Sequence, residues 1–362
     1  MTYVDLRGWI TRYEHEASLN CDTERQRLPA LDREGKRLRV IAPQEALALF
    51  REGAALARRL GEPCWRLYFD HSISGIYIHS LSDPETGARL ANENLVEARK
   101  PQYTGCPFLG LVYHAAIYAL ASTDSTGHAE RIHELIDYVI NHIALDYDTA
   151  CRLASLRAHM ALELDDLEGA FVLAQECLAL STKSPFRLAA THLFLADLSY
   201  WRGELSAGLE HAQESEANAR QAGHDAVLTT AIAWQALLHR RLGDEDAAHD
   251  CYRRAVAQQG RLSVSSGIYV NAVCYFLEAG GEAEQALALR DRQLAESLID
   301  NRPTPQTRIA QLRRARLRGR MGLLQPAEID DLRALISDLR DPTLFLERID
   351  CLERGNFEER PW

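Results

Sequence analysis

Apolar residues recur along the chain at the spacing of one helical face. Val270, Val273, Cys274 and Leu277 occupy positions i, i+3, i+4 and i+7 and form a single apolar stripe. Such a stripe needs a second apolar surface to cover it. The pattern therefore predicts a helix that packs against a neighbouring helix.

A short turn follows this stripe, and a second helix begins directly after it. Gly280-Gly281 is suited to ending a helix in the left-handed conformation. Glu282 to Leu287 then begin a helix whose acidic residues lie at its positive end. The same order recurs upstream at 164–170, 202–208 and 242–248. The chain is therefore predicted to repeat a helix-turn-helix unit.

The repeat has a period of about forty residues, which is the length of two helices of four to five turns and two short turns. The small residue early in each second helix serves as a marker, and these residues are Ala46, Ala88, Ala129, Ala170, Gly208, Ala248 and Ala286. The intervals between them are 42, 41, 41, 38, 40 and 38 residues. A fixed period in this range predicts an all-α helical solenoid.

The turn at Gly243-Asp244 is followed by Ala248, Tyr252 and Ala255. This order resembles the tetratricopeptide (TPR) repeat family, in which Gly-Asp precedes an Ala, an aromatic residue and another Ala along the second helix. The small first-helix position of that family is matched by Ala158, Ala196, Ala236 and Cys274. The resemblance covers residues 43–300. The family's first-helix Trp and closing Pro are mostly missing, and its period is thirty-four residues.

The longer helices are similar to those in the sensor regions of bacterial peptide-pheromone receptors and of some large transcription activators. The resemblance implies a right-handed superhelical solenoid of about eight antiparallel helix hairpins. We expect this solenoid to occupy residues 43–340 as a single domain.

The two ends of the chain depart from the repeat. Residues 1–42 are expected to form a capping helix over 3–20 and then a polar connection over 21–42. That connection either packs its apolar residues over the stack or is mobile, and these residues are Leu28, Leu31, Leu38 and Ile41. After Pro342, a capping helix and tail are expected over 341–362, because the last repeat of a solenoid needs a cover.

Composition and charge restrict the function classes. The 52 acidic residues outnumber the 41 Lys and Arg residues, so the net charge of −11 disfavours nucleic acid and anionic membranes as partners. No stretch approaches the eighteen apolar residues of a membrane span, and the N-terminus lacks a signal-peptide pattern. The eight cysteines form no CxxC pair. We expect a cytoplasmic protein with reduced thiols.

The sequence contains no pattern that points to catalysis. Gly280-Gly281 lacks the Lys-Ser/Thr of a phosphate loop, and Ser72-Ile73-Ser74-Gly75 lacks the first glycine of a nucleophile elbow. The thirteen histidines include no HExxH pair. We therefore predict a protein that is not an enzyme and that needs no cofactor or metal.

In the TPR family the first helices line a concave surface, so the resemblance implies ligand contacts at their inward positions. By the turn register, these are His114, Tyr118, Ser155, His159, Asp197, Tyr200, Trp201, Arg240, Asn271, Tyr275 and Glu278. This mixture of aromatic and hydrogen-bonding groups suits an extended peptide or a partner helix. The leading hypothesis is a scaffold that binds a protein or peptide segment. A regulatory sensor that acts on a separate effector protein is the alternative.

A run of seven arginines at 302–320 is unusual in an acidic chain. Arg313, Arg316 and Arg320 share one flank of the expected helix. Guanidinium groups bind carboxylates and phosphates in pairs of hydrogen bonds, so this flank is a candidate patch for an acidic partner or RNA. The simpler interpretation is that these arginines pair with nearby acids such as Asp330, Asp331 and Asp338.

Overall fold

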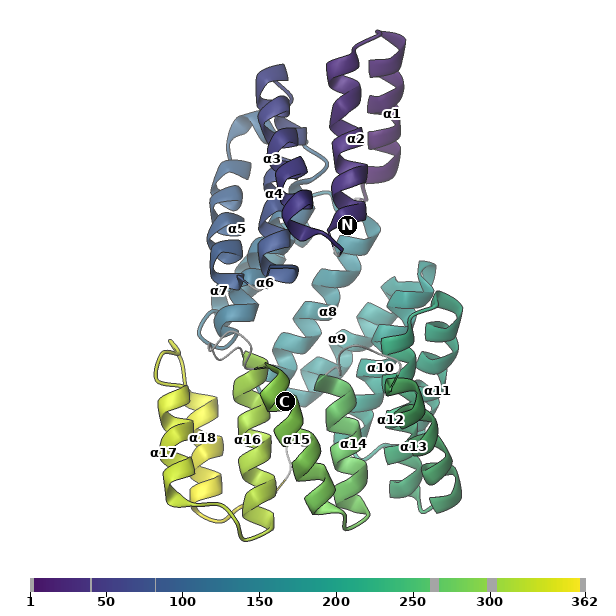
Figure 1. Cartoon of the computed structure of the whole chain (residues 1–362), viewed down its shortest axis with the longest axis vertical. Helices are drawn as coiled ribbons and strands as arrows, with labels where there is room; N and C mark the ends of the chain where they lie inside the picture. The colour runs from purple at the N-terminus through teal and green to yellow at the C-terminus, as the bar shows by residue number, and fades with distance from the viewer. Residues whose placement is uncertain (1–2, 40, 82, 261–266, 298–304, 359–362) are drawn as a thin grey trace. The chain divides into compact units, whose positions relative to one another are not determined.

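The chain folds into helices, as the periodicity predicts. A computed structural model describes residues 3–39, 41–81, 83–260, 267–297 and 305–358. These residues form eighteen α-helices and two short 3-10 helices (Figure 1). Their only β contact is an isolated bridge between Tyr3 and Leu145. The all-α class is confirmed.

The chain divides into two compact units, of which the first comprises Met1–Thr123 and His128–Leu153. Its helices are α1 (Leu6–Leu19), α2 (Thr23–Leu38), α3 (Pro43–Leu60), α4 (Pro63–His79), α5 (Pro84–Ala98), η1 (Pro101–Tyr103), α6 (Leu109–Asp124), α7 (Ala129–His142) and the beginning of α8 (Tyr147–Glu163). From α1 to α5, each helix packs against the next helix in the chain.

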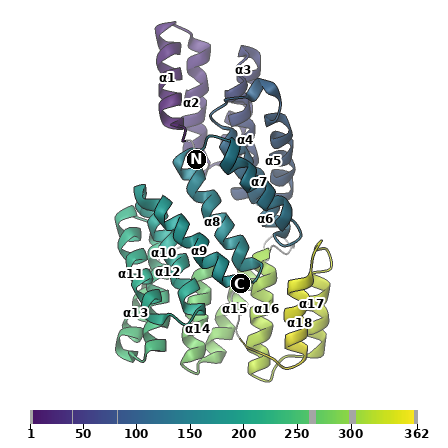
Figure 2. The same cartoon turned by 180° about the vertical axis from the view of Figure 1, so that it is seen from behind.

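The second unit comprises Asp124–Gly127 and Ala154–Trp362. It contains the end of α8 and then α9 (Leu167–Leu180), η2 (Ser181–Lys183), α10 (Pro185–Trp201), α11 (Leu205–Ala222), α12 (Asp225–Leu242), α13 (Glu245–Gln259), α14 (Gly267–Ala279), α15 (Ala283–Ser297), α16 (Pro305–Arg320), α17 (Pro326–Leu335) and α18 (Thr343–Glu353). Figure 2 shows α10 to α13 from behind as antiparallel neighbours. The predicted helix after Pro342 is α18.

The turns between paired helices follow from local chemistry. Gly243 ends α12 in the left-handed conformation at φ 85°, and the Asp244 carboxylate accepts a hydrogen bond from the Ala247 N–H at 3.2 Å. Asp166 caps α9 in the same way through Gly169, at 2.8 Å. Because an Asp side chain tolerates the left-handed region, Asp165 replaces glycine there at φ 65°.

Trp65 of α4 is the centre of the first unit's core and is fully buried. Its ring packs on Trp9 and Tyr13 of α1, on Phe69 one turn further along α4, and on Phe108, with ring centroids between 5.5 and 6.0 Å apart. Aromatic rings in tilted and edge contacts add to the free energy of simple area burial. Trp9 and Tyr13 therefore join α1 to the core of the first unit.

The prediction of a polar connection over 21–42 is wrong, because Thr23–Leu38 form helix α2. Asp22 caps this helix by accepting from the Arg25 N–H at 3.0 Å. Leu28, Leu31 and Leu38 are buried, so the alternative in which these residues pack is correct for the three leucines, whereas Ile41 is 71% exposed and does not pack as predicted. Gly35 lies inside α2, where a Cβ atom would lie 2.4 Å from the Phe50 ring, so glycine lets α2 approach α3 closely.

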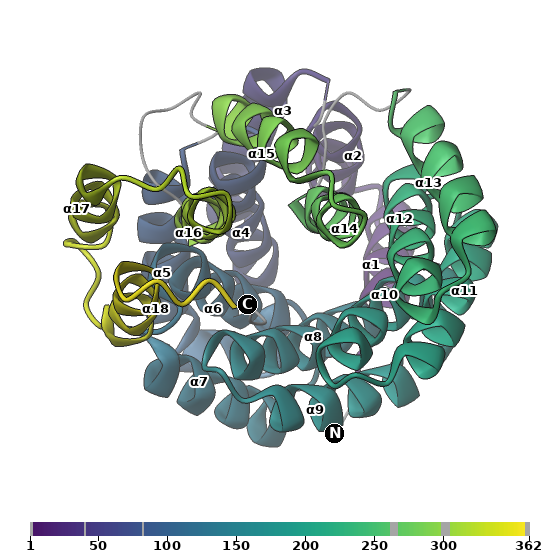
Figure 3. The same ribbon diagram turned by 90° about the horizontal axis from the view of Figure 1, so that it is seen from below.

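The second unit has an inner and an outer layer of helices. Besides their chain neighbours, α10 contacts α12, and α12 contacts α14. Figure 3 shows α12 and α14 on the inner side of this unit and α13 and α15 on its outer side. The apolar stripe at Val270, Val273, Cys274 and Leu277 is buried in the core of this unit, as the periodicity predicts.

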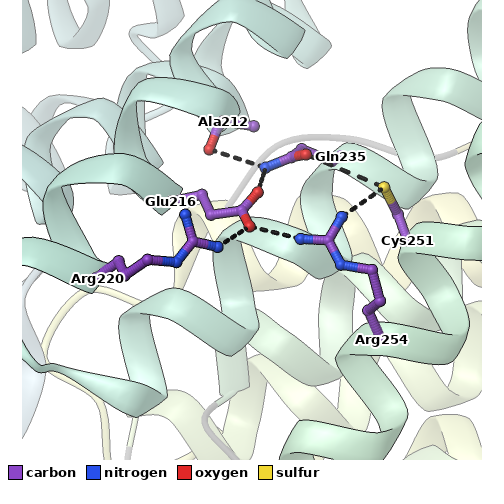
Figure 4. Close-up of polar contacts among 6 residues, drawn as sticks. All are labelled: Ala212, Glu216, Arg220, Gln235, Cys251 and Arg254. Atoms are coloured by element: carbon purple, nitrogen blue, oxygen red, sulfur yellow. Dashed lines mark hydrogen bonds and ion pairs between the residues drawn. The ribbon is translucent and has the colours of Figure 1, made fainter.

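A buried carboxylate joins three helices of the second unit (Figure 4). Glu216 of α11 accepts hydrogen bonds from Arg220 and Arg254, each at 2.5 Å, and from the Gln235 amide at 2.6 Å. The same amide donates to the Ala212 carbonyl at 3.3 Å. Because the carboxylate is paired and hydrogen-bonded, its burial is compensated, and the network fixes α11 against α12 and α13.

Candidate ligand-binding site

The predicted groove residues fall in both units. His114 and Tyr118 belong to α6 of the first unit, and the other nine positions belong to the second unit. Each set is described within its own unit.

The first unit contains a cavity of about 890 Å³, which His114 and Tyr118 line. Their rings stack with centroids 6.2 Å apart, and 37% of Tyr118 is exposed. Phe50, Tyr68 and Phe108 contribute apolar wall from three other segments. The volume lies within the range of about 300–1,000 Å³ that is usual for ligand pockets.

A buried acid is part of the cavity wall. Asp32 of α2 is only 3% exposed and accepts hydrogen bonds from the Tyr68 hydroxyl at 2.7 Å and from the Lys36 ammonium at 2.8 Å. Burial and the adjacent Asp32 carboxylate raise the pKa of Tyr68 well above its ordinary value. Tyr68 therefore remains a protonated hydrogen-bond donor at neutral pH.

Cationic side chains outnumber acids around the cavity. The cations are Arg7, Arg33, Lys36, Arg39 and Arg152, and the acids are Glu14, Asp32 and Asp148. Arg33 pairs with Glu14, Lys36 with Asp32, and Arg152 with Asp148. Arg7 and Arg39 form no ion pair with any residue that the structure describes. The cavity therefore carries a surplus of two positive charges in a chain whose net charge is −11.

In the second unit, three predicted groove residues pack on one another. The Tyr200 and Tyr275 rings are nearly parallel with centroids 6.2 Å apart, and Trp201 meets Tyr275 edge-on at 5.7 Å. Tyr275 is only 3% exposed. These rings therefore join α10 to α14 and contribute to the core of the unit.

Asp197 lies one turn before Trp201 and accepts a hydrogen bond from the Trp201 indole N–H at 2.8 Å. Burial raises the pKa of Asp197 to about 6, although the nearby Arg313 charge and the indole hydrogen bond both oppose this shift. Arg313, predicted for the anion patch, thus lies close enough to α10 to influence a carboxylate there.

Glu278 and Asn271 of α14 bind arginines of the neighbouring helices. Arg316 donates to both oxygens of Glu278 at 2.6 and 2.7 Å, and Arg320 donates to one of them at 2.8 Å. The buried Arg290 donates to the Asn271 amide oxygen at 2.7 Å. Two of the three predicted patch arginines are therefore held by a predicted groove residue.

Of the remaining groove positions, His159 and Arg240 contact residues of other helices. The His159 ring lies against Phe194 with centroids 4.0 Å apart, and burial lowers the pKa of His159 to about 4. Arg240 is buried, donates to the Phe276 carbonyl at 2.9 Å and covers the Phe276 ring at 3.7 Å. Ser155 is half-buried on α8.

The other arginines of the 302–320 run also pair with acids. Arg308 donates twice to Asp338, at 2.8 and 2.9 Å, and Arg314 pairs with Asp291 and Glu328. Arg318 pairs with Glu328 at 2.8 Å. Arg302 lies outside the described residues. Of the acids that the sequence suggests as partners for this run, Asp338 forms such an ion pair, with Arg308.

Within the described ranges, no group of three or more His, Cys, Asp or Glu side chains is arranged to hold a metal ion. No described helix combines the length and apolar character needed to cross a bilayer. No family model matches the sequence, and no curated protein matches it either.

Sequence reasoning missed the α2 side of the cavity. Asp32, Lys36 and Arg39 all lie within 21–42, the segment that the sequence predicts as a polar connection. The spacing of Leu28, Leu31 and Leu38 was the available signal, because it places three apolar residues on one helical face.

Proposed function

We propose that the protein binds an extended acidic segment of a partner protein and carries out no reaction on it. The observation that carries this proposal is the cavity of the first unit, where two arginines without an ion-pair partner among the described residues lie beside an exposed aromatic side chain. Arg7 and Arg39 offer guanidinium groups to carboxylates, and Tyr118 offers an apolar face.

The charge of the cavity favours acidic ligands over other peptides. A local positive surface in a negatively charged protein attracts an acidic segment to that place and repels it elsewhere. Each of the three carboxylates in the cavity forms an ion pair with one cation, and the two charges of each pair neutralise each other. The two other arginines are left for a ligand.

The same pairing supports binding without catalysis. A general acid or base needs a titratable group that is available to the substrate. Glu14, Asp32 and Asp148 already bind Arg33, Lys36 and Arg152, and Asp32 also accepts from Tyr68. We infer that the three carboxylates of the cavity hold their cations rather than act as general acids or bases on the ligand.

We further propose that the helices form a right-handed superhelical solenoid of the long TPR-like type, in a bacterial cytoplasmic protein. The support is the burial of the small marker residues: Ala46, Ala170, Ala248 and Ala286 are fully buried. The inner contacts of α10 with α12 and of α12 with α14 are also those expected of stacked hairpins.

A displayed library of random peptides, selected on the immobilised full-length chain, tests the binding proposal. We expect the retained peptides to be enriched in Asp and Glu. Tyr118→Ala should weaken the best of them about tenfold, a loss of about 1.4 kcal/mol. Tyr138→Ala is the matched control, because Tyr138 is 45% exposed in the same unit and does not line the cavity. Enrichment of basic peptides, or equal effects of the two substitutions, would refute the proposal.

A further inference from the structure

Two histidines of neighbouring helices face each other in the second unit. His192 of α10 and His211 of α11 are both half-buried. Their Nδ1 atoms lie 3.1 Å apart and share a hydrogen bond, and their ring centroids are 5.3 Å apart. The two helices are consecutive in the chain and lie antiparallel to each other (Figure 2). The helix pair therefore brings two imidazole nitrogens together.

Packing contacts on both sides of the histidine pair fix the separation of the two helices. On one side, the buried Ser215 hydroxyl of α11 donates a hydrogen bond to the Ala189 carbonyl of α10 at 2.8 Å. On the other side, a Cβ atom at Gly208 of α11 would lie 3.3 Å from the Ser199 Cβ atom, so the two backbones approach closely there. The distance between the two rings is therefore set by the packing of α10 on α11.

Both rings are neutral at pH 7. Burial lowers the pKa of His192 and of His211 below the ordinary value of 6.5, and the Glu214 carboxylate opposes this shift only in part. A neutral imidazole has one N–H group and one nitrogen with a free lone pair, so one Nδ1 atom donates in this hydrogen bond and the other accepts. The N–H of the donating ring moves to its Nε2 atom by proton exchange with water, and both Nδ1 lone pairs are then available as ligands.

The distance between the two nitrogens matches the span of a metal chelate. Imidazole nitrogens bind ions such as Zn²⁺ at about 2.0–2.1 Å, so two neighbouring ligands in square-planar or tetrahedral geometry are about 2.8–3.4 Å apart. The observed 3.1 Å lies within this range. A small tilt of each ring directs both lone pairs at one ion. Glu210 and Glu214 are exposed on the same helix as His211, and their negative charge attracts a cation to this place.

We propose that His192 and His211 chelate a divalent transition-metal ion through their Nδ1 atoms. Imidazole is a ligand for Zn²⁺, Ni²⁺ and Cu²⁺, and a given site binds Cu²⁺ most tightly of these ions. Among the residues that the structure describes, no third His, Cys, Asp or Glu is arranged with this pair to hold a metal. We assign the remaining coordination positions of the ion to water.

A bound ion would join α10 to α11 and stabilise the second unit. An ion that binds the folded chain and not the unfolded chain raises the free energy of unfolding. The histidine pair lies in the second unit, whereas the cavity of the proposed function lies in the first. The two proposals are therefore independent, because Cu²⁺ binding is measured without a peptide.

Calorimetric titration of the metal-free full-length chain with Cu²⁺ at pH 7 tests the inference. His192→Gln and His211→Gln should each raise the Kd of the tightest site at least about a hundredfold, because a single imidazole lacks the advantage of a chelate. The double variant should raise the Kd little further, because either substitution alone already destroys the chelate. His15→Gln combined with His133→Gln is the control, since these histidines lie on α1 and α7 of the first unit, and it should leave the Kd unchanged.

The wild-type chain decides the question even if a variant fails to fold. Ascorbate and half an equivalent of Cu²⁺ oxidise the histidines that hold the ion, and peptide mass spectrometry then identifies these residues by the added oxygen atom. We expect the oxygen on His192 and His211. Oxidation confined to other histidines would overturn the inference, and so would a Kd that the single substitutions leave unchanged.

Discussion

Arg316 of α16 donates two hydrogen bonds to the Glu278 carboxylate of α14, and the two side chains are only 9% and 6% exposed. The residues are 38 positions apart in the chain. A buried ion pair of this geometry is held by mutual compensation, because each charge satisfies the other in a medium that solvates neither well. Removing one partner leaves the other uncompensated.

Glu278→Gln should therefore lower the free energy of unfolding of the second unit by about 3 kcal/mol. The measure is chemical denaturation followed by circular dichroism at neutral pH. Arg253→Gln is the control, because Arg253 is 75% exposed in its pair with Asp250 and should cost less than about 0.5 kcal/mol. Equal losses of unfolding free energy for the two substitutions would show that the buried ion pair stabilises the chain no more than the exposed one.

Substitution of Glu216 should lower the free energy of unfolding less than substitution of Glu278 does. Glu216→Ala removes the acceptor for Arg220, Gln235 and Arg254, of which the arginines are partly exposed, so we expect a loss of about 2 kcal/mol in the free energy of unfolding. Glu214→Ala, at an exposed position of the same helix, should be nearly neutral. Thermal denaturation of the three chains makes the comparison, and a neutral Glu216→Ala would contradict it.

Protonation of Asp197 should stabilise the folded chain as the pH falls. Its pKa is about 6 in the folded chain, above the ordinary value of 3.8, so the folded state binds a proton more tightly than the unfolded state. The unfavourable contribution of the charged form is fully present above pH 6 and is relieved as the pH falls toward 4. Asp197→Asn should raise the melting temperature at pH 7.5 more than at pH 4.5. The same increase at both pH values would refute this.

Protonation of His159 should have the opposite effect and destabilise the folded chain as the pH falls. Its folded pKa of about 4 lies below the ordinary 6.5, so the unfolded chain binds the proton first, and stability is lost as the pH falls below 6.5. His159→Phe keeps a ring against Phe194 and removes this titration. Between pH 7 and pH 4.5 the variant should lose about 2 kcal/mol less stability than the wild type. Parallel pH profiles for the two chains would contradict the prediction.

Local signals made most helices predictable. The turn at Gly243-Asp244 could be predicted because the left-handed glycine and the aspartate cap both depend on residues between 243 and 247. Helix α2 was not predicted, because few of its residues are apolar. The role of Gly35 within it, which is to admit the Phe50 ring, depends on the position of α3.

The candidate site was predictable only where the helical register decides it. His114 and Tyr118 follow from the register of one helix, and their rings do line a cavity together. The burial of Tyr275 against Tyr200 and Trp201 could not be read from the sequence, because it depends on how closely α14 approaches α10. The pairing of Arg316 with Glu278 depends in the same way on the packing of separate helices.

The proposed function is tested most directly by a fluorescence anisotropy titration of an acidic peptide against three forms of the full chain. These are the wild type, a double variant with Arg7→Gln and Arg39→Gln in the cavity, and a double variant with Arg12→Gln and Arg58→Gln at exposed positions outside it. We predict that the cavity variant raises the Kd at least about tenfold and that the outside variant leaves it unchanged. Equal Kd values for the two double variants would contradict the account.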